Sequence, residues 1–136
     1  MPAASRPHLP LDVLAETLAV CRLSADSPIS PWVAADSPFT TITRTPNELS
    51  ITTVQTAVPT GVPCERDYRA IKVRGPLPLD LIGIFASLAG PLAEAGLSIF
   101  AISTYATDYI LVKQQDLPAA LDVLRQAGHT VTEPRN

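Results

Sequence analysis

The sequence predicts an α+β protein built on an antiparallel sheet, and three observations support this prediction. The stretch Asp80–Val112 reads as an apolar helix followed by a strand, a four-residue turn and a second strand. Residues 39–55 read as another β-hairpin. When the chain is laid on itself with a shift of 60 positions, the two hairpins coincide without a gap. The 136 residues, 46% hydrophobic and 17% charged, suffice for one ordinary domain or two very small ones.

The N-terminal part of the chain is predicted to be a loose arm followed by strand structure. Residues 1–8 are polar and rich in proline, which is typical of a flexible arm. From Leu9 to Leu23 the residue types favour strands, with the two-residue alternation of Leu18, Val20 and Arg22 against Ala19, Cys21 and Leu23. Glu16 lies at a candidate turn, so this segment can form a hairpin.

The middle of the chain is predicted to contain a hairpin and a connector. Closely spaced prolines in Ser24–Pro38 exclude a long helix there. Thr40–Arg44 and Leu49–Gln55 are rich in β-branched residues, and Pro and Asn stand in the turn between them. Residues 56–67, with two prolines and a glycine, read as a connector, and Tyr68–Arg74 reads as a strand.

The first helix is predicted to begin after Asp80, whose carboxylate can cap free N–H groups of the first turn. Pro91 removes the hydrogen bond to the Ser87 carbonyl and predicts a kink, and Gly96 is placed to end the helix. The spacing of apolar residues predicts a core-facing stripe of Ile84, Leu88 and Leu92, with Phe85 beside it.

The C-terminal part is predicted to be a hairpin, a second helix and a short edge strand. Leu97–Thr104 and Tyr109–Lys113 are the two strands of the hairpin. Asp116 is expected to cap a helix that runs to Gln126 and ends before Gly128, and His129–Thr132 can form the edge strand. The expected buried positions of this helix are Leu117, Ala120, Leu121 and Leu124.

The shift of 60 positions suggests an internal repeat. Ile42–Ile51 falls on Ile102–Leu111, and Leu11–Val13 falls on Ile71–Val73. The first copy is degenerate, because prolines shorten its first helix and no room remains for a full second one. Two such units side by side would form one antiparallel sheet with helices on one face.

Charge, apolar runs and motifs exclude several function classes. The net charge of −3 argues against nucleic acid, which requires a concentrated basic surface. The longest apolar run, residues 81–93, is too short to cross a bilayer, and the N-terminus does not resemble a signal peptide, so we expect a cytoplasmic protein without membrane contact. No nucleophile-elbow motif and no glycine-rich phosphate loop occur, so we expect neither catalysis nor a cofactor.

Cysteine and histidine are also read as structural residues. Cys21 and Cys64 lack partners at metal-ligand spacing, and Cys21 reads as a buried free thiol. His8 and His129 lie near opposite ends of the chain and are interpreted as surface or strand-end histidines. We therefore expect no metal site.

Binding of a small anion is better supported than catalysis. Residues 79–84 form a junction at which a helix begins, and the free N–H groups of a helix N-terminus bind carboxylates well. Gly83 would allow the ligand to approach the backbone closely.

From Leu79 through Leu124 the chain closely resembles the ACT-domain family, specifically the small tandem-ACT proteins of the CASTOR type. The helix-to-hairpin run carries this resemblance, above all the stretch Ile102–Val112, which reads ISTYATDYILV. The resemblance implies a ferredoxin-like βαββαβ fold, with a degenerate ACT-like unit at residues 9–60 and an ACT domain at residues 61–136. It also implies a non-catalytic sensor that binds a small ligand, usually an amino acid, between the two units, and that acts on a protein partner or as a homodimer.

The resemblance also implies a set of ligand-binding residues. The carboxylate end of the ligand would lie at Ile82, Gly83 and Ile84, and Asp80 at the same junction is included among the ligand-binding residues. Hydroxyl and cation contacts would come from Thr104, Thr107 and Asp108, and the shift of 60 adds Arg44 and Glu48. Structural alternatives remain open, because Asp80 can be only a helix cap, Asp108 can close its turn, and Glu48 can be a solvated turn residue. Relatives often carry Thr at the position of Ile82 and an acid at that of Ala106. The alternative function is therefore an interaction module that has lost ligand binding.

Overall fold

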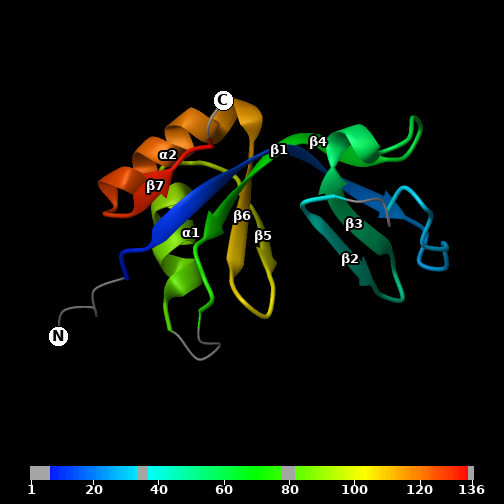
Figure 1. Cartoon of the computed structure of the whole chain (residues 1–136), viewed down its shortest axis with the longest axis horizontal. Coiled ribbons are helices and arrows are strands. Elements are labelled where there is room, and N and C mark those ends of the chain that lie inside the picture. Colours follow the sequence, from blue (N-terminus) through cyan, green and yellow to red (C-terminus); the bar gives the residue numbers. More distant parts are fainter. Residues whose placement is uncertain (1–6, 34–36, 78–81, 135–136) are drawn as a thin grey trace. The chain divides into compact units, whose positions relative to one another are not determined.

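The structure, a computed structural model, describes residues 7–33, 37–77 and 82–134. The chain forms two compact units, of which unit 1 comprises Met1–Ala15 and Arg69–Asn136 and unit 2 comprises Glu16–Tyr68. Two long strands, β1 (Pro10–Leu23) and β4 (Cys64–Val73), each contribute to both units (Figure 1). The boundaries between the units therefore differ from the expected single boundary between residues 60 and 61. The reason is that the first part of β1 pairs with strands of unit 1.

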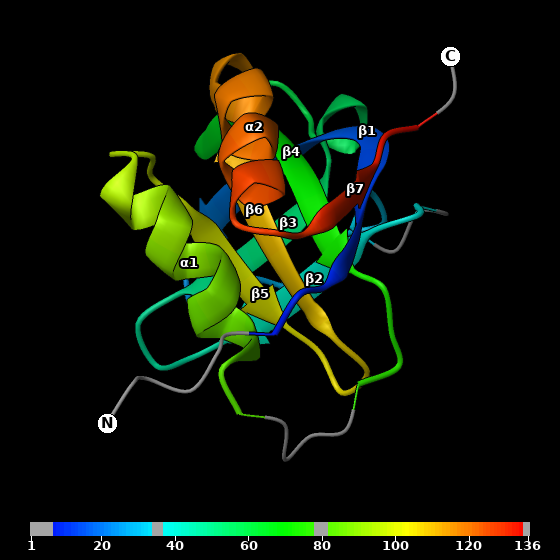
Figure 2. The same ribbon diagram turned by 90° about the vertical axis from the view of Figure 1, so that its left-hand side faces the viewer.

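Unit 1 combines its parts of β1 and β4 with two helices and three further strands. These are α1 (Ile84–Glu94), β5 (Phe100–Ser103), β6 (Asp108–Lys113), the 3-10 turn η2 (Gln114–Asp116), α2 (Leu117–Gln126) and β7 (Thr130–Thr132). The strand order is β7-β1-β4-β6-β5, with β5 antiparallel to β6 and β7 parallel to β1. Both helices lie on one face of this sheet (Figure 2). Unit 1 thus has the expected ferredoxin-like elements, with the first part of β1 inserted beside β4.

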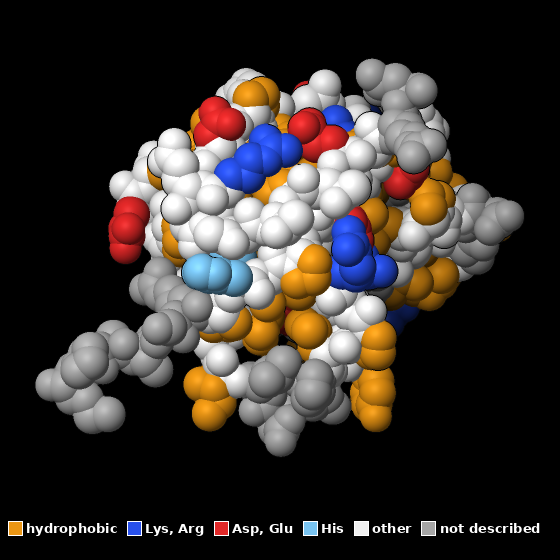
Figure 3. Space-filling model, turned by 60° about the vertical axis from the view of Figure 1, so that its left-hand side comes forward, with side chains coloured by type: hydrophobic (Ala, Val, Ile, Leu, Met, Phe, Trp, Pro, Cys, Tyr) orange, Lys and Arg blue, Asp and Glu red, His pale blue; other side chains and the backbone are white. Residues whose placement is uncertain are grey.

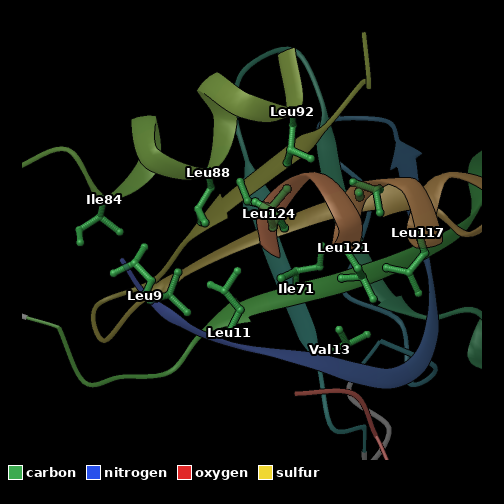
Figure 4. Close-up of a cluster of buried hydrophobic side chains, with 14 residues drawn as sticks. Leu9, Leu11, Val13, Ile71, Ile84, Leu88, Leu92, Leu117, Leu121 and Leu124 are labelled. Carbon is green, nitrogen blue, oxygen red and sulfur yellow. The ribbon is translucent and has the colours of Figure 1, made fainter. Parts of the chain in front are cut away.

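The core of unit 1 lies between the helices and the sheet (Figure 4). The stripes predicted from the helical spacing are confirmed, since Ile84, Leu88 and Leu92 of α1 and Leu117, Ala120, Leu121 and Leu124 of α2 are buried. The prediction for Phe85 is wrong, because its side chain is 42% exposed. The polar residue Ser87 is buried instead, and its Oγ donates to the Ile84 carbonyl at 2.7 Å, which satisfies the hydroxyl within the helix.

Glycines mark both ends of α1, and neither helix has a side-chain capping hydrogen bond at its N-terminus. The residue before α1 is Gly83, which has a left-handed backbone (φ 84°); Asp80 lies outside the described residues. Gly96 ends α1 as predicted, with φ 78° and a hydrogen bond from Leu97 N to Leu92 O that closes a Schellman motif. Asp116 precedes α2 as expected, but its side chain makes no capping hydrogen bond, so its predicted capping role is wrong.

The helix α1 continues through Pro91, and a histidine replaces the hydrogen bond that this proline removes. His129 Nε2 lies 2.9 Å from the Ser87 carbonyl, and His129 Nδ1 accepts from Leu9 N at 3.0 Å. Because a backbone amide can only donate, the ring proton is on Nε2. His129 directly precedes β7, so the strand-end interpretation is confirmed, but it is 5% exposed, so the surface interpretation is wrong. Its ring joins the residue before β1, the helix α1 and the segment after α2 inside unit 1.

Unit 2 is a smaller sheet in which β2 (Thr40–Arg44) and β3 (Leu49–Val54) form the predicted hairpin. The last part of β1 pairs antiparallel with β3, and the order is β2-β3-β1-β4. The expected hairpin around Glu16 is wrong, because β1 is one continuous strand there. The core contains Ala19, Cys21, Val33, Leu49 and Ile51, with Trp32, Val58 and Val62 packed against it. The described part of unit 2 contains a 3-10 turn, η1 (Gln55–Ala57), and no α-helix.

The two hairpins repeat each other, but with an offset of 59 positions rather than 60. Thr45 N donates to Glu48 O across the first turn, and Thr104 N donates to Thr107 O across the second, both at 2.9 Å. The 3-10 turns that follow, η1 and η2, begin at Gln55 and Gln114 and show the same offset. The predicted shift of 60 is therefore wrong by one residue. In a strand one residue reverses the face to which every side chain points.

Candidate ligand-binding site

The N-terminus of α1 forms one end of the candidate site. Ile82 is 91% exposed, Gly83 is the N-cap residue, and Ile84 turns into the core with 7% exposure. Gly83 has no side chain that could cap the helix, and the first turn contains no acidic residue. The first helical hydrogen bond runs from Ser87 N to the Gly83 carbonyl at 3.0 Å. The N–H groups before Ser87 are the natural donors for an incoming carboxylate.

The signature turn, residues 104–107, lies beside the loop that follows β4. Leu77 N donates to Ala106 O at 2.8 Å, and Thr107 Oγ1 donates to the Val73 carbonyl at 2.6 Å. Thr107 is 5% exposed, while Thr104 Oγ1 accepts from Thr107 N at 3.3 Å and donates to Thr107 O at 3.1 Å. In this conformation both hydroxyl groups form the turn and anchor it to the end of β4.

Asp108 follows this turn as the first residue of β6, opposite Ser103 of β5. It is half-buried, and among the described residues its carboxylate has no hydrogen-bond or ion-pair partner. Of the three acid and hydroxyl side chains expected in this part of the site, Asp108 is the one whose polar atoms are not already used by the fold. A cationic group of a ligand could therefore pair with it.

Arg44 and Glu48 belong to unit 2. The Arg44 guanidinium donates to the carbonyls of Ala25 and Ser27, the latter at 2.8 Å. Glu48 is half-buried, and its backbone N–H donates to Thr45 Oγ1 at 3.2 Å. With the offset of 59, Arg44 corresponds to Ser103 and not to Thr104. The reason for selecting these two residues, the shift of 60, is therefore wrong.

Unit 2 also contains an open pocket that the sequence did not predict. Its volume is about 700 Å³, within the range of small-ligand sites. It is lined by Arg22, Leu23, Ser24, Ala25, Ser27, Asn47 and Pro63. The Arg22 guanidinium donates to the Asn47 carbonyl at 3.4 Å, and Arg44 holds Ala25 and Ser27.

Some charged groups of unit 1 pair with each other and stabilise the fold. Arg74 contacts Asp12 at 2.6 Å, and this hydrogen bond holds the pKa of the Asp12 carboxyl below its usual value.

Within residues 7–33, 37–77 and 82–134, no group of three or more metal-ligating side chains lies close enough together to hold a metal ion. No helix in those residues is long and apolar enough to cross a membrane. On the face drawn in Figure 3, acidic and basic side chains are interspersed and no broad basic surface forms.

Two family models match the chain. The model described as the ACT domain matches residues 64–126, and a second, described as an N-terminal domain, matches residues 16–61. A curated relative is the rat cytosolic arginine sensor for mTORC1 subunit 1, which is 37% identical over 70 residues. The match covers 49% of this chain and 21% of the relative, so the chain matches about a fifth of that protein's length.

Solved structures share the fold over nearly the whole chain. A protein from Agrobacterium tumefaciens is 34% identical, covers 96% of each chain and superposes with a TM-score of 0.89. The aspartokinase alpha and beta subunits are 15% identical, with coverage of 89% of this chain and 98% of that chain and a TM-score of 0.64. At that identity the second likeness shows the fold alone.

Proposed function

From the match of the ACT-domain model to residues 64–126 we propose that the chain is a member of the ACT-domain family, and that it is a non-catalytic regulatory protein that binds an amino acid. The curated relative is named as an arginine sensor, which supports an amino acid as the ligand class. Because the match covers only part of that relative, the ligand and any protein partner are proposals for this chain. The name of the relative also supports the expectation of a cytosolic location.

The observation that carries the proposal is the uncapped N-terminus of α1. A free amino acid brings a carboxylate, and the first-turn N–H groups and the positive end of the helix dipole favour such a group. Among the described residues, a Cβ added at Gly83 would meet only Pro7 Cδ, at 3.8 Å, so none of these residues blocks the approach. Asp108 is the proposed partner of a cationic group on the ligand. Thr104 and Thr107 hold the turn that positions it.

We further propose that the ligand lies between two ACT units, one of which is unit 1. A ligand that contacts both units stabilises the arrangement in which they enclose it, so binding can be transmitted to a partner. The second unit can be unit 2 of the same chain or a unit of another copy. Ligand titrations followed by sedimentation separate these cases, because only the second makes ligand binding depend on association of two chains.

The test is a thermal-shift panel of the twenty amino acids with the intact protein. A ligand at 100 times its Kd stabilises the fold by about 2.7 kcal/mol, a shift of several degrees for a chain of this size. Absence of stabilisation by every amino acid at millimolar concentration would contradict the proposal.

A matched pair of variants tests the place of binding. Gly83 and Gly96 stand at opposite ends of α1 with similar left-handed backbones, φ 84° and 78°, and an added Cβ has space at both. Gly83→Ala and Gly96→Ala should therefore destabilise the protein by similar amounts, roughly 1–2 kcal/mol each. We expect Gly83→Ala alone to reduce the ligand-induced shift. Equal ligand responses in both variants would place the ligand elsewhere.

A second candidate function is a protein-interaction module. Large apolar side chains are exposed in unit 1, namely Ile82 (91%), Tyr105 (85%) and Phe85 (42%). Two of them flank the start of α1, where relatives often carry a polar residue in place of Ile82. This function predicts association that grows with protein concentration, is indifferent to amino acids, and decreases in Ile82→Ser. A monomeric protein at all concentrations, with or without amino acids, would contradict it.

A further inference from the structure

Two cysteines that are 43 positions apart in the sequence face each other in unit 2. Cys21 is in β1 and Cys64 begins β4, and these strands are neighbours in the sheet. Arg22 N donates to the Pro63 carbonyl at 3.0 Å, which makes Arg22 and Pro63 opposite residues of an antiparallel pair. The next opposite pair is Cys21 and Cys64. In such a non-hydrogen-bonded pair the Cα atoms are about 4.5 Å apart, within the range that a disulfide spans.

The side chains point to the same face of the sheet. Cys21 is 1% exposed in the core of unit 2, and Cys64 packs against that core while remaining partly exposed. The two thiols also lie within hydrogen-bonding reach of each other. Burial, followed by the nearby Cys64, raises the pKa of Cys21 to about 12. Cys64 is therefore the thiol that solvent and small reagents reach. Cys21 is the buried thiol that can attack a disulfide formed on Cys64.

We propose that Cys21 and Cys64 form an internal disulfide on reaction with a small disulfide such as glutathione disulfide. The Cys64 thiolate attacks one glutathione sulfur, releasing a glutathione thiolate and leaving a mixed disulfide on Cys64. The Cys21 sulfur, after losing its proton to water, attacks the Cys64 sulfur, and the second glutathione thiolate leaves. The protein thus loses two electrons and two protons, and one glutathione disulfide becomes two glutathione thiols.

The disulfide would act on the pocket of unit 2. Arg22 follows Cys21 and Pro63 precedes Cys64, and both neighbours line that pocket. A covalent bond between the cysteines fixes the distance between these two walls. Formation of the disulfide can therefore alter the binding of a small ligand in this pocket in response to the redox state of the surroundings. The inference does not depend on amino-acid binding at α1, which belongs to the other unit.

The experiment equilibrates the intact protein with mixtures of reduced and oxidised glutathione at pH 8, followed by acid quenching and intact-mass measurement. We expect a monomer whose mass has decreased by two hydrogen atoms. The equilibrium constant for forming this product should be at least about tenfold larger in the folded protein than in denaturant, because folding holds the thiols together and the unfolded loop must close. An equal or smaller constant in the folded protein would overturn the proposal, as would a mixed disulfide or unreacted thiols as the end product.

Single variants test the assigned order of attack. Cys21→Ser should stop at the mixed disulfide on Cys64, whereas Cys64→Ser should retain its free Cys21 thiol. The fluorescence of Trp32, which packs on the same core, checks that each variant is folded. Reaction of a folded Cys64→Ser protein at the wild-type rate would overturn the assignment of Cys64 as the attacking thiol.

Discussion

Replacement of His129 by phenylalanine tests the linkage between this residue and Pro91. The variant keeps a ring of similar size but removes both hydrogen bonds, to Leu9 N and to the Ser87 carbonyl. Each buried backbone group left without a partner costs about 1–3 kcal/mol, so His129→Phe should destabilise the protein by roughly 2–6 kcal/mol. That is a large part of the 5–15 kcal/mol typical of a folded domain.

The same substitution should cost less when Pro91 is also replaced. In Pro91→Ala, residue 91 regains an N–H that can donate to the Ser87 carbonyl, the bond that an α-helix normally makes. Only Leu9 N then loses its partner when the ring is removed. The cost of His129→Phe should therefore fall by about 1–3 kcal/mol in this background.

The measurement is a double-mutant cycle from urea denaturation followed by circular dichroism. Pro118→Ala is the matched control, because Pro118 lies in the first turn of α2, where a proline removes no helical hydrogen bond. His129→Phe should cost the same with or without that replacement. Equal costs in the wild-type and Pro91→Ala backgrounds would refute the compensation of the proline by the histidine.

Three further predictions concern unit 1. Thr107→Val should lower the free energy of unfolding, measured by urea denaturation, by about 1–3 kcal/mol, because the Val73 carbonyl loses its donor. An unchanged free energy of unfolding would show that water replaces the hydroxyl. Asp12 has a pKa below its unfolded value, so its ion pair with Arg74 stabilises the fold above about pH 4 and this contribution is lost as the pH falls through the folded pKa. The thermal midpoints of wild type and Asp12→Asn should therefore differ slightly at pH 7, and this difference should shrink as the pH falls below about 4; a constant difference would contradict this. Gly128→Ala should lower the thermal midpoint, because the backbone there has φ 100° and the new Cβ would lie 2.7 Å from a neighbouring imidazole atom; an unchanged midpoint would show that the ring moves freely.

The sequence predicted those parts of the fold that depend on local pattern. Residues at helical spacing, such as Leu88 and Leu124, are buried as expected because a stripe on one helix face must pack against the sheet. Both hairpins were predicted because β-branched strands flank turns that contain typical turn residues. The family resemblance and the helix-to-hairpin run were likewise readable without coordinates.

The incorrect predictions concern features that depend on residues far apart in the chain. The buried position of His129 depends on Pro91 and Leu9, and no local pattern links these three. The offset of 59 could not be separated from 60, because the two hairpins share few identical residues. The continuity of β1 through Glu16 arises from its pairing with β3 and β4, which outweighs the local turn signal.

The candidate site was predictable to a lesser degree. Gly83 and Ile82 were identified because a helix start is visible in sequence, whereas the engagement of the Thr107 hydroxyl by Val73 required coordinates. The pocket of unit 2 brings together the end of β1, the first hairpin turn and the residue before β4. Only the pairing of strands places these segments side by side.

The division of β1 between the two units decides how the chain can be shortened. A fragment of residues 61–136 contains the ACT-type helices and the signature hairpin but lacks Pro10–Ala15, the strand that joins β7 to β4. Such a fragment would expose hydrogen-bonding edges on both strands and would lose the apolar side chains of Leu11 and Val13 from its core. A transplantable ACT unit from this protein must therefore carry the N-terminal strand, either in its natural place or rejoined by a circular permutation.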